Sequence, residues 1–238
     1  MAWTGDNSVL NQHSPKNYMY GDTVFILDEI TDDNCAYLIG DLTFFVMNQE
    51  NQGKVLTFII NSPGGSVYTM LNIIGLMNVA RINNIEIITF VMGCAASAAS
   101  VLAVQGDKRM MNNVSRHFIH FGTMWSVTEK QSEIEKIYTQ TKDLSERLNN
   151  LYLESCNGKL TKSVLLDLQK DERGYLTAEQ CMQYGLCDAI IEDDLVQKRK
   201  NDADREEFEE TFASYQKNKN KIIKKPIKKP ILKSKKKK

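Results

Sequence analysis

The sequence lacks the marks of several large protein classes. No apolar run approaches the roughly 18 residues of a membrane-spanning helix, so no membrane span or membrane partner is expected. The N-terminal residues are polar and show no charged segment followed by an apolar one, so no secretory signal is expected. The five cysteines are odd in number and include no CxxC pair, which favours free thiols in a reducing compartment. These absences together predict a cytoplasmic protein.

Charge is unevenly distributed along the 238 residues. The formal net charge is zero, but residues 216–238 hold twelve lysines and no acidic residue, whereas residues 1–215 carry a net charge of −12. Such a low-complexity tail buries little apolar surface and is expected to be disordered. Contact with a polyanion is one alternative role, because lysines displace counterions from phosphates. Contact with the acidic stretch just before the tail is another.

Hydrophobic periodicity predicts an α/β domain over residues 21–194. Apolar, β-branched runs alternate with segments of helical spacing in the order β-α-β-α-β, which implies parallel strands joined by right-handed crossovers. The expected strands are residues 23–27, 54–60, 85–92 and 116–121, and the expected helices are residues 32–48, 67–81 and 96–104. Functional sites of such sheets form at the C-terminal ends of the strands.

A different pattern covers residues 126–156. Apolar side chains recur there at steps of three and four with charged residues on the other face, which predicts one helix of roughly thirty residues, about 45 Å long. Helices of that length in small domains often project and pack against a partner. The remaining expected segments are a flexible arm at 1–20, short helices at 162–169 and 178–184, a strand at 186–191, a charged, helix-compatible extension at 195–216 and a disordered tail at 217–238.

Two small-residue turns follow neighbouring predicted strands. Residues 61–66 are Asn-Ser-Pro-Gly-Gly-Ser, and residues 93–97 are Gly-Cys-Ala-Ala-Ser. A strand that ends in such a turn and restarts as a helix exposes backbone N–H groups that can bind a developing oxyanion. The N–H groups of Gly65 and Ala98 are the predicted donors, which favours a hydrolase over a binding module. The alternative for the first turn is a plain β-turn. No phosphate-loop lysine follows the glycines of this turn, so no nucleotide is expected to bind there.

Ser97 and His120 are the candidate nucleophile and general base. Ser97 lies at the predicted start of a helix, where the dipole favours negative charge. The alternatives are that Ser97 only caps an alanine-rich helix, or that Ser100 is the nucleophile, although we expect Ser100 to pack inside. Of the three histidines, His120 ends a predicted strand, His117 faces the other side of that strand, and His13 lies in the arm.

These residues resemble the proteolytic subunit of the ATP-dependent Clp protease, the ClpP family. The resemblance is carried by the two turns, by Ile119-His120 and by the closing segments at 175–180 and 184–188, and it runs from about residue 22 to residue 194. It implies the ClpP/crotonase fold, with stacked β-α-β units. It also implies that the helix at about 126–156 is the family's projecting handle.

The resemblance further implies a self-compartmentalising serine endopeptidase that hydrolyses unfolded polypeptides. Ser97 would be the nucleophile, His120 the base, and Gly65 and Ala98 the oxyanion donors. The chain would form heptameric rings, two of which join into a tetradecamer with an internal chamber. An AAA+ unfoldase such as a Clp ATPase would feed it substrates. The family needs no metal or other cofactor, so none is expected here.

The sequence departs from the family pattern at the third member of the triad. Ungapped alignment places Arg173 where the family has an aspartate, but two carboxylates lie just upstream. We predict that Asp171 orients His120, with Glu172 or no carboxylate as alternatives. The segment after His120, at residues 121–125, lacks the family's Gln-Pro pair and glycine-rich strand, so substrate binding is expected to differ. The connection between the two turns is about three residues longer than in the family, and the lysine-rich tail is not a family feature.

Two other functions are compatible with the sequence. A catalytically inactive ring subunit would keep the fold and the handle but lack a working triad, and Arg173 favours it. A crotonase-type acyl-CoA enzyme shares the fold and the oxyanion turns but has no need of the pair formed by Ser97 and His120. The abundance of asparagine, lysine and isoleucine is typical of an AT-rich genome, such as that of a phage or of some bacteria.

Overall fold

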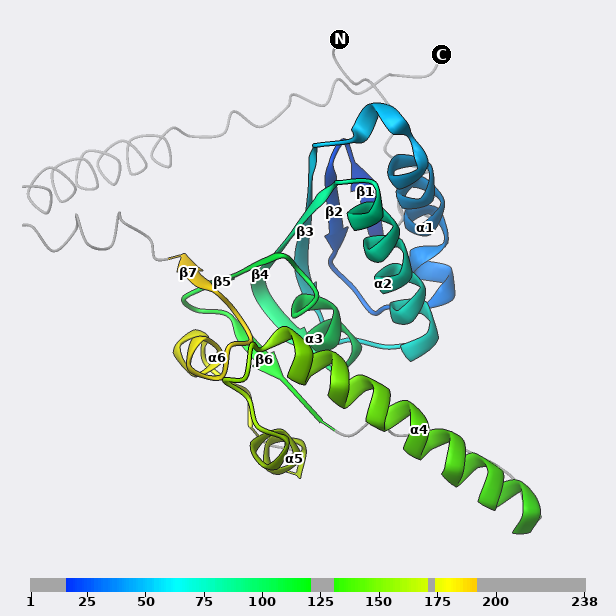
Figure 1. The fold of residues 1–238 in the computed structure, drawn as a ribbon, viewed down its shortest axis with the longest axis vertical. Helices are drawn as coiled ribbons and strands as arrows, with labels where there is room; N and C mark the ends of the chain where they lie inside the picture. The colour runs from blue at the N-terminus through cyan, green and yellow to red at the C-terminus, as the bar shows by residue number, and fades with distance from the viewer. Residues whose placement is uncertain (1–15, 121–130, 171–173, 192–238) are drawn as a thin grey trace, which may run out of the picture. The chain divides into compact units, whose positions relative to one another are not determined.

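The computed structural model describes residues 16–120, 131–170 and 174–191 (Figure 1). In these residues a seven-stranded sheet has the order β1-β2-β3-β4-β5-β7, and β6 also pairs with β4. Only the pair of β1 and β2 is antiparallel; the other pairs are parallel, as the β-α-β pattern predicts. The strands are β1 (Asn17–Tyr20), β2 (Thr23–Ile26), β3 (Val55–Ser62), β4 (Glu86–Ala96), β5 (Lys108–Asn112), β6 (Arg116–Phe118) and β7 (Ala189–Ile191).

Six α-helices and one short 3₁₀ helix lie in the described residues. They are α1 (Asp32–Met47), η1 (Gln49–Asn51), α2 (Val67–Ile82), α3 (Ala98–Ala103), α4 (Gln131–Ser155), α5 (Lys162–Lys170) and α6 (Ala178–Tyr184). The predicted handle corresponds to α4, which extends away from the sheet in Figure 1; residues 126–130 of that prediction lie outside the described part. None of the described helices has the length and apolar character that crossing a membrane requires.

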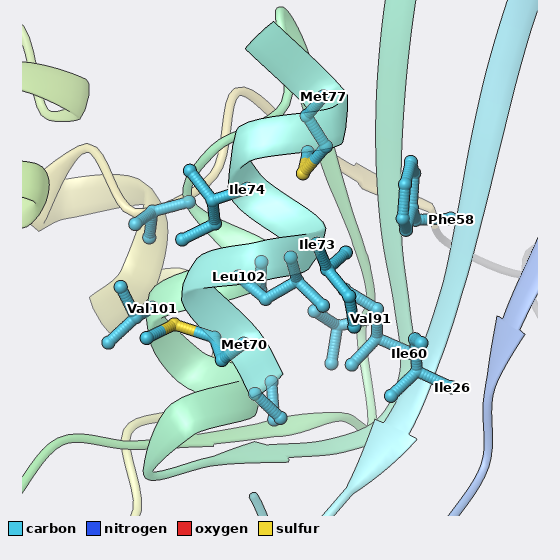
Figure 2. Close-up of a cluster of buried hydrophobic side chains, with 14 of the residues drawn as sticks. Ile26, Phe58, Ile60, Met70, Ile73, Ile74, Met77, Val91, Val101 and Leu102 are labelled. Carbon is cyan, nitrogen blue, oxygen red and sulfur yellow. The ribbon is translucent and has the colours of Figure 1, made fainter. Parts of the chain in front are cut away.

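The core lies between the sheet and helices α2 and α3. Side chains of β3 alternate between the two faces, and Phe58 and Ile60 are fully buried on the helix side. Figure 2 shows Ile73 and Met77 of α2 packed against this face, and both are also fully buried. The small residues of α3, all buried, let that helix approach the sheet closely. The apolar packing thereby fixes the strand ends from which the functional turns leave.

Several predicted boundaries need correction. The arm predicted at 1–20 is wrong for Asn17–Tyr20, which form β1 and pair with β2; residues 1–15 lie outside the described part. The N-cap of α1 is Thr31, whose hydroxyl accepts the N–H of Asn34. Strand β4 continues to Ala96 because β6 pairs with its last three residues, so α3 starts two residues later than predicted.

Strand β5 was not predicted, because Lys108 and Arg109 interrupt its apolar pattern. The structure explains both charges. Lys108 reaches the exposed Glu86 at 2.8 Å. Arg109 is buried and is held by the carboxylate of Asp188, with its Nε 2.9 Å from Oδ2. Its Nη1 also donates to the carbonyl oxygens of two further residues, at 2.5 Å and 2.8 Å. Burial alone would raise the pKa of Asp188, but the hydrogen bonds and charge of Arg109 hold that pKa below its ordinary value.

Replacing Arg109 by methionine should lower the free energy of unfolding by about 2–3 kcal/mol, because Asp188 and two carbonyls lose a donor in a site partly shielded from water. Lys108→Met on the same strand is the matched control. It removes only an exposed ion pair and should leave stability nearly unchanged. Urea unfolding of the three chains measures both effects. Equal stability of Arg109→Met and wild type would contradict this account of β5.

Candidate active site

Ser97 occupies a strained turn between β4 and α3. Its backbone angles are φ 55° and ψ −124°, and a positive φ is unfavourable for a residue other than glycine. The main-chain N–H of Ser97 donates to the carbonyl of Phe118 on β6, at 3.0 Å. Ser97 is the N-cap residue of α3, but its hydroxyl makes no capping hydrogen bond to that helix. A serine on a sharp strand-to-helix turn is the arrangement that presents a nucleophile.

The turn after β3 touches the Ser97 turn. Gly64 has φ +98°, and a Cβ built on it would lie 2.5 Å from the carbonyl oxygen of Ala96 and 2.6 Å from the Cβ of Ser97. Gly65 has φ +139°, so both glycines occupy backbone conformations that side chains disfavour. Among the described residues, neither the Gly65 N–H nor the Ala98 N–H donates a hydrogen bond. Two N–H groups without an acceptor in the described residues therefore lie next to Gly64 and Ser97 in the chain.

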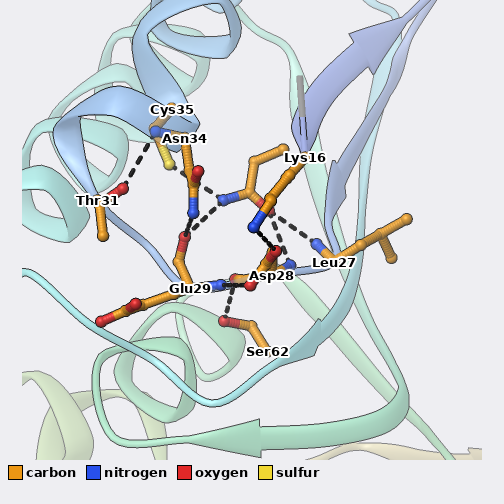
Figure 3. Close-up of polar contacts among 9 residues, drawn as sticks. Lys16, Leu27, Asp28, Glu29, Thr31, Asn34, Cys35 and Ser62 are labelled. Atoms are coloured by element: carbon orange, nitrogen blue, oxygen red, sulfur yellow. Dashed lines mark hydrogen bonds and ion pairs between the residues drawn. The ribbon is translucent and has the colours of Figure 1, made fainter. Parts of the chain in front are cut away.

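A polar cluster fastens the glycine turn to the segment that follows β2 (Figure 3). The hydroxyl of Ser62 donates to the carbonyl of Asp28 at 2.7 Å and accepts the N–H of Gly64 at 3.1 Å. The fully buried Asn17 side chain accepts the N–H groups of Leu27 and Asp28, at 2.9 Å and 3.0 Å. The main chain of Ile30 exchanges hydrogen bonds of 2.7 Å with the turn on both sides of Gly65. The position of Gly65 thus depends on β1, whose role the sequence did not indicate.

His120 lines the same cavity as Ser97 and Ala98. The cavity has a volume of about 30 Å³. The imidazole of His120 stacks on Phe118 with ring centroids 5.4 Å apart. No hydrogen bond joins His120 to Ser97 in this structure, although both residues are described. Such bonds are often long in free enzymes and shorten when substrate binds. Ser97, Ala98 and His120 therefore line one cavity, and Gly64, the neighbour of Gly65, contacts the Ser97 turn.

The walls of the cavity come from helices α2, α3, α4 and α5. Apolar side chains and one buried amide pair form them; Gln169 Nε2 donates to Asn149 Oδ1 at 2.7 Å. The sequence does not assign Asn149 or Gln169 to the site, because helical periodicity alone does not show which face of α4 or α5 meets it. The other lining residues are Val67, Met70, Val101, Ser145, Leu148 and Tyr152.

The third triad position lies outside the described residues, as do Asp171, Glu172 and Arg173. The structure describes the chain again from residue 174 to residue 191. Leu176 and His117 exchange two backbone hydrogen bonds, of 3.0 Å and 2.7 Å. Because His117 belongs to the strand that leads to His120, this pairing ties the following segment to the same strand. No cluster of three or more histidine, cysteine, aspartate or glutamate side chains suited to a metal ion occurs in the described ranges.

Ser100, the rival nucleophile, is fully buried, which confirms that it packs inside. Its Oγ lies 2.6 Å from Nε2 of His117 and 2.6 Å from the hydroxyl of Tyr152. His117 is 1% exposed, whereas His120 is half-buried at the cavity, so the prediction that they face opposite sides is confirmed. Burial lowers the pKa of His117 to about 4, and the hydrogen bond with Ser100 only partly opposes this shift.

Acid should destabilise the fold through His117. The unfolded chain binds this proton with a pKa near 6.5 and the folded chain with a pKa of about 4, so stability falls as pH drops between these values. The expected contribution is about 3 kcal/mol between pH 7 and pH 4. Urea unfolding of wild type and His117→Val at several pH values isolates it, because the carboxylates act equally in both chains. Equal pH slopes of the two chains would contradict the prediction.

The class of protein that this fold and this site define is a hydrolase. A family model described as Clp protease matches residues 11–194. The ATP-dependent Clp protease proteolytic subunit of Ligilactobacillus salivarius (strain UCC118) is 34% identical over 173 residues, which are 71% of this chain and 82% of the relative. The subunit of the same name from Chlorella vulgaris is 31% identical over 183 residues, 74% of this chain and 85% of the relative. The chain belongs to the Clp protease family, and the predicted ClpP/crotonase fold is confirmed.

Proposed function

We propose that this chain is a serine endopeptidase that hydrolyses unfolded polypeptides at Ser97. The observation that carries the proposal is the contact between two turns. Ser97 stands on a strained turn against Gly64, with the unused N–H groups of Gly65 and Ala98 beside it and His120 on the same cavity. A nucleophile and a base on one cavity, with an oxyanion site beside the nucleophile, are the parts that acyl transfer needs. Relatives named as proteolytic subunits support the same activity.

In this mechanism His120 takes the proton of the Ser97 hydroxyl as Ser97 attacks the peptide carbonyl. The tetrahedral oxyanion accepts hydrogen bonds from the Gly65 and Ala98 N–H groups, which stabilise it because they are held in place beforehand. His120 then donates its proton to the leaving amine, and the acyl-enzyme is hydrolysed by a water that His120 activates. Asp171 is the proposed carboxylate that orients the imidazole. The backbone pairing of Leu176 with His117 concerns only the described residues that follow Asp171 in the chain.

The proposed enzyme works as an oligomer. In parallel sheets both faces are normally covered, yet the helices of the described residues cover only one face of β3 and β4, and Ile59 and Phe90 on the other face are half-buried. On α4, Ile134 is 46% exposed. Contiguous exposed apolar surface marks an interface, and we propose that these side chains belong to one. By analogy with the family we propose heptameric rings joined into a tetradecamer and fed by an AAA+ unfoldase such as a Clp ATPase, in the cytoplasm.

The lysine-rich tail has a separate proposed role. Its twelve lysines and lack of acidic residues suit a polyanion, which would bind them in a salt-dependent way.

A second candidate function is a ring subunit without activity. The specific observations that favour it are the missing hydrogen bond between Ser97 and His120 and the presence of Arg173 at the family's aspartate position. A crotonase-type acyl-CoA enzyme is the third and weakest candidate, because it would not need the nucleophile and base that share the cavity.

Labelling with a fluorophosphonate tests the proposal, because this reagent reacts with activated serines. Intact mass should show one adduct per wild-type chain, peptide mapping should place it on Ser97, and Ser97→Ala should remain unlabelled. Ser163→Ala changes an exposed serine of α5 and should label like wild type. An assembled, folded wild type without an adduct would favour the inactive subunit. Thioester hydrolysis in place of peptide hydrolysis would favour the crotonase-type enzyme.

A further inference from the structure

Three polar side chains from three elements meet in the core behind Ser97, and the proposed mechanism uses none of them. They are Ser100 of α3, His117 of β6 and Tyr152 of α4, joined through Ser100 by the two hydrogen bonds of 2.6 Å. None of the three is more than 3% exposed. Buried polar groups are costly unless they are hydrogen-bonded to one another, so this group of three requires an explanation.

Each of the three elements carries or borders part of the active site. Ser100 lies one helical turn after Ser97, and its own N–H donates to the Ser97 carbonyl at 3.0 Å. His117 lies on β6, three residues before His120. The carbonyl of the next residue, Phe118, accepts the Ser97 N–H. Tyr152 lines the cavity together with Ser97 and His120. The hydrogen-bonded side chains therefore connect the nucleophile turn, the strand of the base and the wall that α4 provides.

Catalytic chemistry by Ser100 and His117 is excluded by their surroundings. Ser100 is fully buried and has no surface on which a substrate carbonyl could bind. Burial keeps His117 neutral at physiological pH, since its pKa is lowered to about 4. These residues can still contribute to the site through their directional hydrogen bonds. Such bonds fix distances and orientations more sharply than apolar contacts, which tolerate sliding.

We propose that Ser100, His117 and Tyr152 are positioning residues, which set the placement of the Ser97 turn relative to His120 and use α4 as the fixed support. This inference rests on the proposed peptidase function. Displacing a catalytic group by about 1 Å can cost about 100-fold in rate, so a network that sets this placement acts on kcat more than on KM. The proposal also predicts that removing all three side chains lowers activity without lowering stability.

The test compares Tyr152→Phe with the triple variant Ser100→Ala/His117→Val/Tyr152→Phe in the assembled full-length chain. Tyr152→Phe should lower kcat for an unstructured peptide about 10- to 100-fold and change KM less than about threefold. The triple variant leaves no unsatisfied partner behind, so its urea midpoint should match or exceed that of wild type while its kcat stays low. Tyr37→Phe, which alters an exposed tyrosine of α1, is the matched control and should behave as wild type.

The outcomes separate this inference from the proposed function. A triple variant that is as active as wild type would overturn the positioning role and leave the peptidase assignment intact. A loss of activity in proportion to a loss of stability in both variants would also overturn it, since that result describes packing alone. A wild-type chain that neither cleaves peptide nor reacts with fluorophosphonate would overturn the proposed function, and the inference with it.

Discussion

Replacing Gly64 by alanine should lower peptidase activity at least 100-fold and destabilise the fold by about 1–3 kcal/mol. A Cβ at this position would lie 2.5 Å from the carbonyl oxygen of Ala96 and 2.6 Å from the Cβ of Ser97, which is far closer than atoms can pack. The backbone adds strain, because φ is +98°. The two turns must then move apart, and this movement would displace Ser97 relative to the N–H groups of Gly65 and Ala98.

Gly75→Ala provides the matched control for this prediction. Gly75 lies in the exposed part of α2, and a Cβ there would meet nothing within 4 Å. Alanine is the better helix former, so the variant should gain about 0.5–1 kcal/mol and keep its activity. Peptide hydrolysis and urea unfolding of both variants measure the contrast. An active Gly64→Ala chain would mean that contact between the two turns is unnecessary for the site.

Replacing Asp171 by asparagine should reduce kcat by about 10⁴-fold, because a triad that loses its carboxylate holds the imidazole in the wrong tautomer. The size of this effect distinguishes the proposed triad from a simple pair of Ser97 and His120. Glu172→Gln, at the alternative position, should cost no more than a few-fold if Asp171 is the orienting group. The comparison uses kcat for the same peptide in assembled chains.

Asp167→Asn is the control for general loss of charge near this segment. Its carboxylate is exposed and pairs only with Lys170, at 3.3 Å, so activity should not change. If Asp171→Asn retains activity and Glu172→Gln loses it, the assignment within the triad is wrong. If both retain activity, the chain works with two catalytic residues or a different carboxylate.

The parts of the fold and site that the sequence predicted are those encoded by contiguous residues. The turns at Gly64 and Ser97 each follow an apolar strand, and small residues leave few other structures open to them. The strand-to-helix order then brings the two turns to one edge of a parallel sheet, and His120 lies two residues beyond β6, which ends at Phe118 and not at residue 121 as predicted. Chain order and strand direction were therefore sufficient to place these residues together.

The parts that the sequence did not predict depend on partners far along the chain. Strand β5 could not be predicted because it contains the charged Arg109. The carboxylate that allows Arg109 to be buried belongs to Asp188, 79 residues later in the chain. Tyr152 appeared only as one apolar position of a long helix. Its hydroxyl acquires a role because Ser100, 52 residues earlier, lies opposite it in the fold. Local periodicity carries no information about such pairings.

Hydrolysis of an unstructured peptide by the assembled chain tests the central claim most directly. The account predicts that purified wild type cleaves internal peptide bonds and that Ser97→Ala, at the same oligomeric state and urea midpoint, loses about 10³-fold or more of this activity. Equal cleavage by the two chains would show that Ser97 is not the nucleophile. No cleavage by a correctly assembled wild type, with or without an added unfoldase, would contradict the peptidase assignment itself.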